Sequence, residues 1–226
     1  MTYQNDRRRV WEERWQQRDA EEFGWYLSEP PSQLVELVES GRIPAGAALD
    51  VACGNGVATR YLARSFVPAV GIDIALAAVA QSRAGETGPT LARFLVADAT
   101  ATFPFKDRSF GFVFDRGGVQ NLPVDVWPRY FHEVARVLRP GGFFQLLSSR
   151  PDGGGAARES RPLRSKVAAL VRRKRGAEPP HHARLRRLAH PAFDVLTLED
   201  FSFRTQGGKA RRFTHALLRR APDPAG

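Results

Sequence analysis

A glycine turn between two patterned segments is the first feature of this sequence that could bind a ligand. Residues 48–52 form a short apolar run that contains Asp50 and is typical of a buried strand. A CGNG turn follows at residues 53–56, and residues 57–63 restart with helical spacing. Glycines in such a turn permit positive φ and a close approach of the backbone to a ligand. Because the N–H groups at the next helix start favour an electronegative group, the pattern predicts half of a βαβ unit with a binding site at its turn.

Acidic residues recur where later strands are predicted to end. Three further strands are predicted, over residues 69–74, 94–97 and 110–114. Asp73, Asp98 and Asp115 stand at or just after their carboxyl ends. Asp73 follows the glycines by about 20 residues, where an acid hydrogen-bonds a ribose in nucleotide-binding sheets. A dinucleotide-binding fingerprint would need a third glycine where Thr59 stands, so that fingerprint is incomplete.

Helices predicted between these strands indicate the fold class. An Ala-rich helix over residues 75–83 and an amphipathic helix over residues 126–138 alternate with strands, and a fifth strand spans residues 143–147. Residues 193–203 and 209–219 are predicted to pair as a hairpin. This alternation predicts an α/β, Rossmann-like, doubly wound and mostly parallel sheet in a single domain.

The main domain is predicted to span residues 47–226, after a helical appendage over residues 1–46. Residues 1–9 are polar and expected to fray. Ser32, which follows two prolines, is expected to cap a short helix.

Aromatic side chains gather in this appendage. Trp11 and Trp15 have the spacing that places two residues on one helical face. Trp15, Trp25 and Tyr26 are candidates for a lid over a substrate. The alternative is that these rings only attach the appendage to the domain.

The positive charge is concentrated in one segment. The 226-residue chain has a net charge of +10, and residues 151–187 carry +8 of it, from 11 Lys or Arg side chains against three acidic ones. We interpret this segment as a basic insertion that is solvated, covers a substrate or binds anions. Nucleic acid is an alternative partner that the nearly neutral remainder of the chain does not favour.

The cysteine count and the hydropathy indicate the compartment. Cys53 is the only cysteine, which excludes a disulfide framework and a multi-Cys metal site, and no metal is predicted. No apolar run reaches the ~18 residues of a membrane span. Residues 7–9 (RRR) lead into WEERW and not into an apolar stretch, so we expect no signal peptide, no membrane partner and a cytoplasmic location.

Four strings in order resemble one enzyme family. They are GRIPAGAALDVACGNG at 41–56, AVGIDI at 69–74, FDRGGVQNLP at 114–123 and VARVLRPGGFFQLL at 134–147. Together they resemble the small class I S-adenosylmethionine (SAM) dependent methyltransferases, and within these the thiopurine, thiol and tellurite-type group. The resemblance implies an enzyme with SAM as cofactor, S-adenosylhomocysteine (SAH) as product, and an antiparallel strand near the C-terminal edge of the sheet.

The resemblance also assigns the cofactor contacts to the glycine turn and the strand ends, at Asp50, Cys53, Gly54, Asn55, Gly56, Asp73, Ile74, Asp98, Ala99, Asp115 and Arg116. By this resemblance Asp50 and the turn face the methionine part of SAM, and Asp73 takes the ribose hydroxyls. Asp98 takes the adenine amino group, and Asp115 lies near the reacting methyl.

One departure from the family bears on catalysis. Where the family often has Cys-Phe-His-His, this chain has GVQN at 118–121, so histidines that handle protons in some members are missing. The candidates for catalysis are Asp115, Gln120 and Asn121, while His132 is expected on the outer side of its helix. Since an amide cannot take up a proton, we predict direct in-line methyl transfer to a small-molecule acceptor with a soft nucleophile, a thiol or an amine.

Two other functions stay open at this point. The first is an RNA or DNA methyltransferase that uses the basic segment, although residues 115–118 (DRGG) lack the Asp/Asn-Pro-Pro-aromatic string of amino-directed enzymes. The second is a SAM-binding domain without turnover, because binding and catalysis share the same residues. A nicotinamide-dependent oxidoreductase is a more distant alternative.

Overall fold

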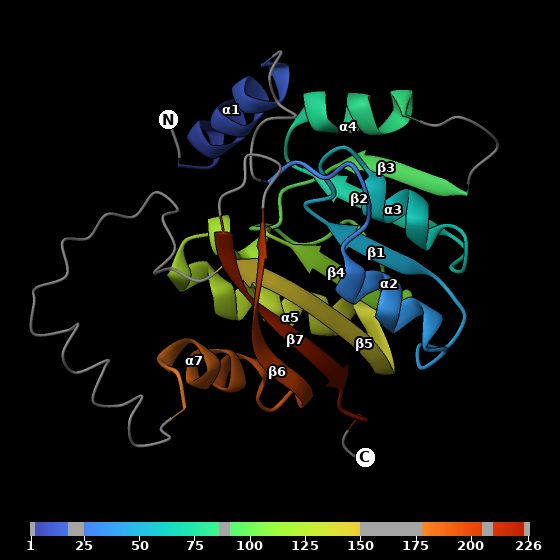
Figure 1. Ribbon diagram of the computed structural model, residues 1–226, viewed down its shortest axis with the longest axis vertical. Coiled ribbons are helices and arrows are strands. Elements are labelled where there is room, and N and C mark those ends of the chain that lie inside the picture. Colours follow the sequence, from blue (N-terminus) through green and yellow to red (C-terminus); the bar gives the residue numbers. More distant parts are fainter. Residues whose placement is uncertain (1–2, 18–24, 86–90, 150–177, 205–209, 224–226) are drawn as a thin grey trace, which may run out of the picture.

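A single mixed sheet forms the centre of the molecule. The computed structural model describes residues 3–17, 25–85, 91–149, 178–204 and 210–223 (Figure 1). The strands are β1 (Ala48–Val51), β2 (Ala69–Asp73), β3 (Ala92–Val96), β4 (Phe110–Arg116), β5 (Leu138–Ser149), β6 (Phe193–Arg204) and β7 (Ala210–Arg220). They lie in the order β3-β2-β1-β4-β5-β7-β6.

The strand directions confirm the predicted fold class. β1 to β5 pair in parallel, whereas β7 lies antiparallel between β5 and β6. The chain winds outwards from β1 to β3 and then returns to β4 on the other side of β1. This reversal opens a crevice at the carboxyl ends of β1 and β4, where ligands bind in such sheets.

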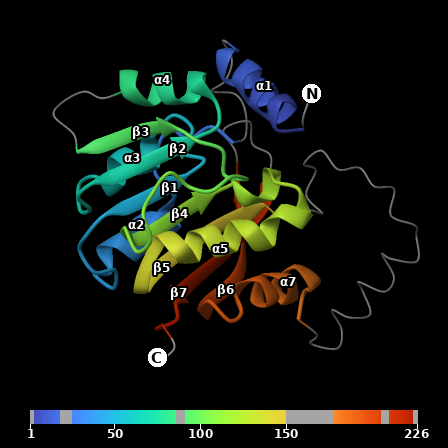
Figure 2. The ribbon, with the colours of Figure 1, turned by 180° about the vertical axis from the view of Figure 1, so that it is seen from behind.

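Helices cover both faces of the sheet (Figures 1 and 2). α2 (Ser32–Glu39) and α3 (Val57–Leu62) lie on one face, while α5 (Trp127–Val137) and α7 (Pro180–Ala189) lie on the other. α4 (Leu76–Ala84) packs beside β2 and β3, and α1 (Tyr3–Gln16) packs on α4. None of the helices in the described ranges combines the length and apolar character needed to cross a bilayer.

Period-two alternation along the strands divides the core into two layers. On β4, Val113 points towards the α5 side, and Phe112 and Phe114 point towards the α2 side. The α5 layer includes Phe131 and Phe144, whose rings meet edge to face at 5.8 Å between centroids. Both faces of β1, β2 and β4 are therefore buried, which fixes the register of the carboxyl ends that form the site.

The structure corrects several local expectations. α1 begins at Tyr3, so residues 3–9 are helical and not frayed. Ser32 was predicted to be the N-cap of α2, but it is the first helical residue and Pro31 occupies the N-cap position. No side chain forms a capping hydrogen bond at this end of the helix. Residues 97–109, between β3 and β4, contain only turns and bends, where the alternation predicted a helix.

Other boundaries shift because tertiary pairing extends the elements. β5 begins at Leu138, which pairs with Phe110 across a register irregularity, and not at residue 143 as predicted. The predicted hairpin is confirmed as β6 and β7. Most of the basic segment at 151–187, including a short helix expected over 165–175, lies outside the described residues.

Candidate functional site

The glycine turn after β1 has the positive φ values that the sequence predicts. Gly54 and Gly56 have φ values of +55° and +77°, and Gly56 forms the N-cap of α3. A Cβ atom on Gly56 would lie 2.7 Å from the ring of Phe94, so a side chain does not fit there. Ser82 donates a 2.7 Å hydrogen bond to the Gly54 carbonyl and fixes the turn against α4. Glycine is required here by conformation and by space.

Asp73 holds the turn from the neighbouring strand. Its Oδ2 accepts a 3.0 Å hydrogen bond from the Gly54 N–H, and its Oδ1 accepts one of 3.0 Å from the Ala75 N–H. Burial raises the pKa of this carboxyl, while the bonds from Ala75 and Gly54 lower it. The side chain lines the cavity described below, and each oxygen keeps a second lone pair for a ligand hydroxyl.

Asp50 lies deeper on β1. It is 2% exposed and accepts a 2.6 Å hydrogen bond from the Thr59 hydroxyl. Burial raises its pKa to about 7, the bond from Thr59 lowers it, and the negative charges of Asp115 and Asp73 raise it. A cationic ligand group nearby would favour the ionised form.

Asp115 ends β4 and is completely buried. Its carboxylate accepts hydrogen bonds of 2.6 Å from the Gly118 N–H, 3.0 Å from the Val119 N–H and 2.6 Å from the Tyr130 hydroxyl. Burial raises its pKa to about 6, against the lowering effect of these bonds. Asp115 is absent from the cavity lining, so it shapes the 116–118 loop from behind.

Asp98 also points elsewhere. Its Oδ1 accepts hydrogen bonds of 2.8 Å from both the N–H and the hydroxyl of Thr100, and it lies 3.5 Å from Arg7 of α1. Its neighbours Ala97 and Ala99 line the cavity, but Asp98 itself does not. Its side chain therefore ties α1 to the turn after β3.

A cavity of about 450 Å³ joins the glycine turn to the N-terminal aromatic residues. Cys53, Gly54, Asn55 and Ile74 form part of its wall. Burial raises the pKa of the Cys53 thiol well above its usual value, which keeps that side chain protonated.

Three tryptophans form the opposite wall. Trp15 is 4% exposed and packs on Ala75 and Ala78, with its ring 4.6 Å from that of Trp25. Trp11 and Trp25 line the cavity together with Trp15, whereas Tyr26 only packs behind them. The aromatic appendage is thus both attached to the domain and exposed to the cavity.

The remaining candidate residues lie at the mouth. Gln120 and Asn121 line the cavity, where the Gln120 side chain accepts a hydrogen bond from the Ser149 N–H and Asn121 donates to the Gly117 carbonyl. Arg116 donates a 3.1 Å hydrogen bond to the Trp25 carbonyl, and burial lowers its pKa to about 10.

Histidines do not line this cavity in the described part of the chain. His132 is exposed, as predicted, and borders a separate cavity of about 410 Å³ between α5 and α7. His215 on β7 contacts Gln145 on β5 and Glu199 on β6.

Comparison with known proteins identifies this arrangement. Residues 48–142 match the protein family described as "Methyltransferase domain". This part of the chain therefore resembles a methyltransferase domain, as the sequence motifs predict. The matched residues run from the start of β1 to the first residues of β5, so they include the glycine turn, Asp73 and Asp115.

Relatives of this region come from mycobacteria. The chain is 32% identical over 125 residues to a 2-heptyl-1-hydroxyquinolin-4(1H)-one methyltransferase of Mycobacteroides abscessus, covering 54% of each chain. It is 38% identical over 106 residues to a fatty-acid O-methyltransferase of Mycolicibacterium smegmatis, covering 46% of this chain and 37% of that one. The chain spans about half or less of the length of these curated relatives.

A solved structure shares nearly the whole fold. It is described as "Conversion of a Disulfide Bond into a Thioacetal Group during Echinomycin Biosynthesis", with a TM-score of 0.70 and 22% identity. The alignment covers 97% of this chain and 94% of that one. The shared fold therefore extends beyond residue 142 into the terminal hairpin.

The residues of this region fit SAM. Gly54 lines the cavity together with Cys53 and Asn55 of the turn, and Asp73 presents a buried carboxylate to the same cavity. Sequence reasoning missed the partners that hold these groups, above all Thr59 on Asp50 and Tyr130 on Asp115. Tyr130 lay on the predicted apolar stripe of residues 126–138. The sequence pattern there does not distinguish a tyrosine that only packs from one whose hydroxyl donates a hydrogen bond.

Proposed function

We propose that this protein transfers the methyl group of SAM to a small-molecule acceptor. One observation carries the proposal: a single cavity of about 450 Å³ connects the glycine turn and Asp73 with the tryptophans of the N-terminal segment. SAM supplies an activated methyl on a sulfonium, so the task of the protein is to align the acceptor and exclude water. Alignment of this kind lowers barriers by ~7–11 kcal/mol in favourable cases.

The proposed cofactor contacts follow the cavity wall. Asp73 receives the ribose hydroxyls, and Asp50 with the Gly54–Gly56 turn faces the methionine part. The adenine lies beside the Ala99 backbone. The Asp98 side chain does not line the cavity and contacts Thr100 and Arg7 through Oδ1, so we assign it to the turn that positions Ala99.

The tryptophans give the proposed acceptor side. Trp15 and Trp25 line the cavity, and aromatic faces stabilise a sulfonium through cation–π attraction. They also offer an apolar surface to the body of an acceptor. We propose that this segment covers the substrate during transfer.

The nucleophile is proposed to be a thiol or an amine. In the described part of the chain no histidine borders the cavity, and Asp50 and Asp73 already hold Thr59 and the glycine turn. A thiol needs little help, because a few per cent is thiolate near neutral pH. The resemblance of residues 114–123 to the thiol- and thiopurine-directed group supports the same choice.

A carboxylate is the second candidate acceptor, because four arginines line the cavity. They are Arg7, Arg14, Arg116 and Arg211. A carboxylate is ionised at neutral pH and needs no base, and guanidinium groups bind it through paired hydrogen bonds. The fatty-acid O-methyltransferase named above is a relative whose name fits such an acceptor.

Calorimetry with SAM and SAH, followed by an acceptor panel read out as SAH formation, tests the proposal. Asp73→Asn should weaken both ligands by ~1–3 kcal/mol, because it removes an acceptor from the ribose site and from the Gly54 N–H. Asp125→Asn, at an exposed aspartate on the domain surface, is the matched control and should bind as the unaltered protein does. Unchanged SAM affinity in folded Asp73→Asn protein would refute the cofactor site. SAH formation with neither thiols, amines nor carboxylates would refute the acceptor class.

A further inference from the structure

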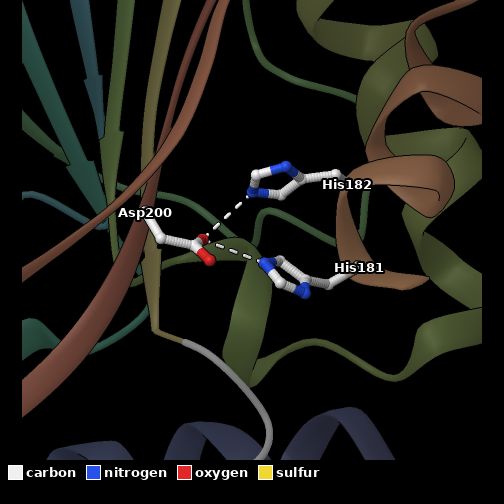
Figure 3. A group of neighbouring side chains, drawn as sticks. All are labelled: His181, His182 and Asp200. Carbon is white, nitrogen blue, oxygen red and sulfur yellow. Dashed lines mark hydrogen bonds and ion pairs between the residues drawn. The ribbon is translucent and has the colours of Figure 1, made fainter. Parts of the chain in front are cut away.

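Three metal-ligating side chains converge between α7 and β6 (Figure 3). His181 and His182 are in the first turn of α7, and Asp200 is on β6. One ligand atom from each lies within 4.8 Å of the others. None of the three lines the cavity of the glycine turn, so the cluster is separate from the proposed methyl-transfer site.

Both imidazoles approach the same carboxylate oxygen. The Nε2 atoms of His181 and His182 lie 2.9 and 3.0 Å from Asp200 Oδ1. Consecutive helical residues are ~100° apart around the axis and do not normally face one point. One histidine would be enough for a hydrogen bond that only holds α7 against β6. A ligand bound by Asp200 and both imidazoles would use both histidines.

The spacing suits cis ligands on one ion. With metal–ligand bonds of ~2.0–2.2 Å, adjacent ligand atoms are ~2.9 Å apart at right angles and ~3.4 Å apart in a tetrahedron. The 2.9 and 3.0 Å between Asp200 Oδ1 and the two Nε2 atoms are short enough for one ion to bridge. Two imidazoles and one carboxylate supply three ligands and leave the remaining positions of an ion open.

The carboxylate is fixed from a third element. Thr214 on β7 pairs with Asp200 in the sheet register, is 3% exposed and donates a 2.9 Å hydrogen bond to Asp200 Oδ1. The hydrogen bond from Thr214 therefore orients the carboxylate, as neighbours of this kind do for metal ligands.

We propose that His181, His182 and Asp200 bind one divalent transition-metal ion through two Nε2 atoms and a carboxylate oxygen. The nitrogen-rich ligand set favours Zn²⁺, Co²⁺ or Ni²⁺ over Mg²⁺ and Ca²⁺, which prefer oxygen. The ion would join the start of α7 to the β6–β7 hairpin.

Titration of tag-free, chelator-treated full-length protein tests the site. Zn²⁺ calorimetry should give one site per chain, and Co²⁺ should add a visible absorption band that saturates at one equivalent. His182→Gln and Asp200→Asn should each weaken Zn²⁺ by at least tenfold, as loss of one of three ligands requires. His190→Ala, at an exposed histidine at the C-cap of the same helix, is the matched control and should bind as before.

Thermal unfolding gives a second readout that separates binding from folding. Zn²⁺ should raise the midpoint of the unaltered protein and of His190→Ala, but not that of His182→Gln. If His182→Gln unfolds without metal, Asp200→Asn, which keeps the shape and an acceptor oxygen, carries the test. Absence of a stoichiometric site, or Zn²⁺ affinity unaffected in both ligand variants, would overturn the proposal.

Discussion

Replacement of Tyr130 by Phe should destabilise the protein more at pH 8 than at pH 5. The Tyr130 hydroxyl donates a 2.6 Å hydrogen bond to Asp115, and both residues are 0% exposed. Within the described residues, the N–H groups of Gly118 and Val119 also donate to this carboxylate. The substitution removes one donor from a buried acid and leaves the ring packing intact.

The size of the effect follows from the charge of Asp115. Burial raises its pKa from 3.8 to about 6 in the folded protein, although Tyr130 lowers it. At pH 8 the carboxylate is ionised, and a hydrogen bond to a charged group contributes ~1.5–3 kcal/mol. At pH 5 the acid is mostly protonated, and a bond between neutral groups contributes only ~0.5–1.5 kcal/mol.

The same shift sets the sign of the pH dependence. Because the pKa is higher in the folded state, that state binds more protons between about pH 4 and pH 6. Asp115 therefore favours folding below that window, and this contribution is lost as the pH rises through 6. Tyr130→Phe raises the folded pKa further and extends the loss to higher pH.

Urea unfolding at both pH values measures the difference in the free energy of unfolding. Tyr61→Phe, at a half-buried tyrosine on α3, is the control for loss of a phenol hydroxyl and should show no comparable pH dependence. An equal loss of stability at pH 5 and pH 8 in Tyr130→Phe would refute the reasoning that Asp115 is ionised and held by this hydroxyl.

Four further predictions test other parts of the site. Gly56→Ala should lose ~1–3 kcal/mol of stability and most SAM binding, because Gly56 has φ +77° and a Cβ atom there would clash with Phe94. The control Gly41→Ala, with φ +68° and open space around it, should lose less stability and bind SAM normally. Unfolding and calorimetry measure the two effects. The ratio of SAM to SAH affinity should rise from pH 6 to 8, because Asp50 has a pKa of about 7 and its ionised form favours the sulfonium; a constant ratio contradicts this. Trp25→Ala should reduce turnover more than tenfold while SAM affinity stays within a few-fold, and equal losses of both would contradict a role over the acceptor. RNA binding should be weak and fall steeply with salt, and a nanomolar complex at physiological salt would favour the nucleic-acid alternative.

The sequence alone determined the order and type of the main elements. Short apolar runs that end in acids, separated by helical patterns, predict parallel strands because both faces of such strands are buried. The turn at residues 53–56 was readable because positive φ and close backbone approach require glycine whatever the surroundings. Helices, strands and turns that depend on local sequence were therefore predicted. Their observed ends differ from the predicted ends by a few residues where pairing in the sheet extends a strand.

The same reasoning could not decide which strand-end acids face the cavity. Asp73 does, Asp115 is buried behind the loop that follows it, and Asp98 turns towards Thr100 and α1. The direction of a side chain at a strand end depends on the turn after it and on partners far along the chain. Tyr130, which holds Asp115, is 15 residues away and resembles any packing ring in the sequence.

The cluster at α7 shows the limit most clearly. His181 and His182 are adjacent in a basic stretch, and Asp200 is 19 and 18 residues further on, in a strand of ordinary composition. That separation matches no metal-binding spacing, and the sequence predicted no metal. Only the packing of α7 against the β6–β7 hairpin brings two imidazoles onto one carboxylate, because contacts between elements depend on their three-dimensional packing and leave no periodic signal in the chain.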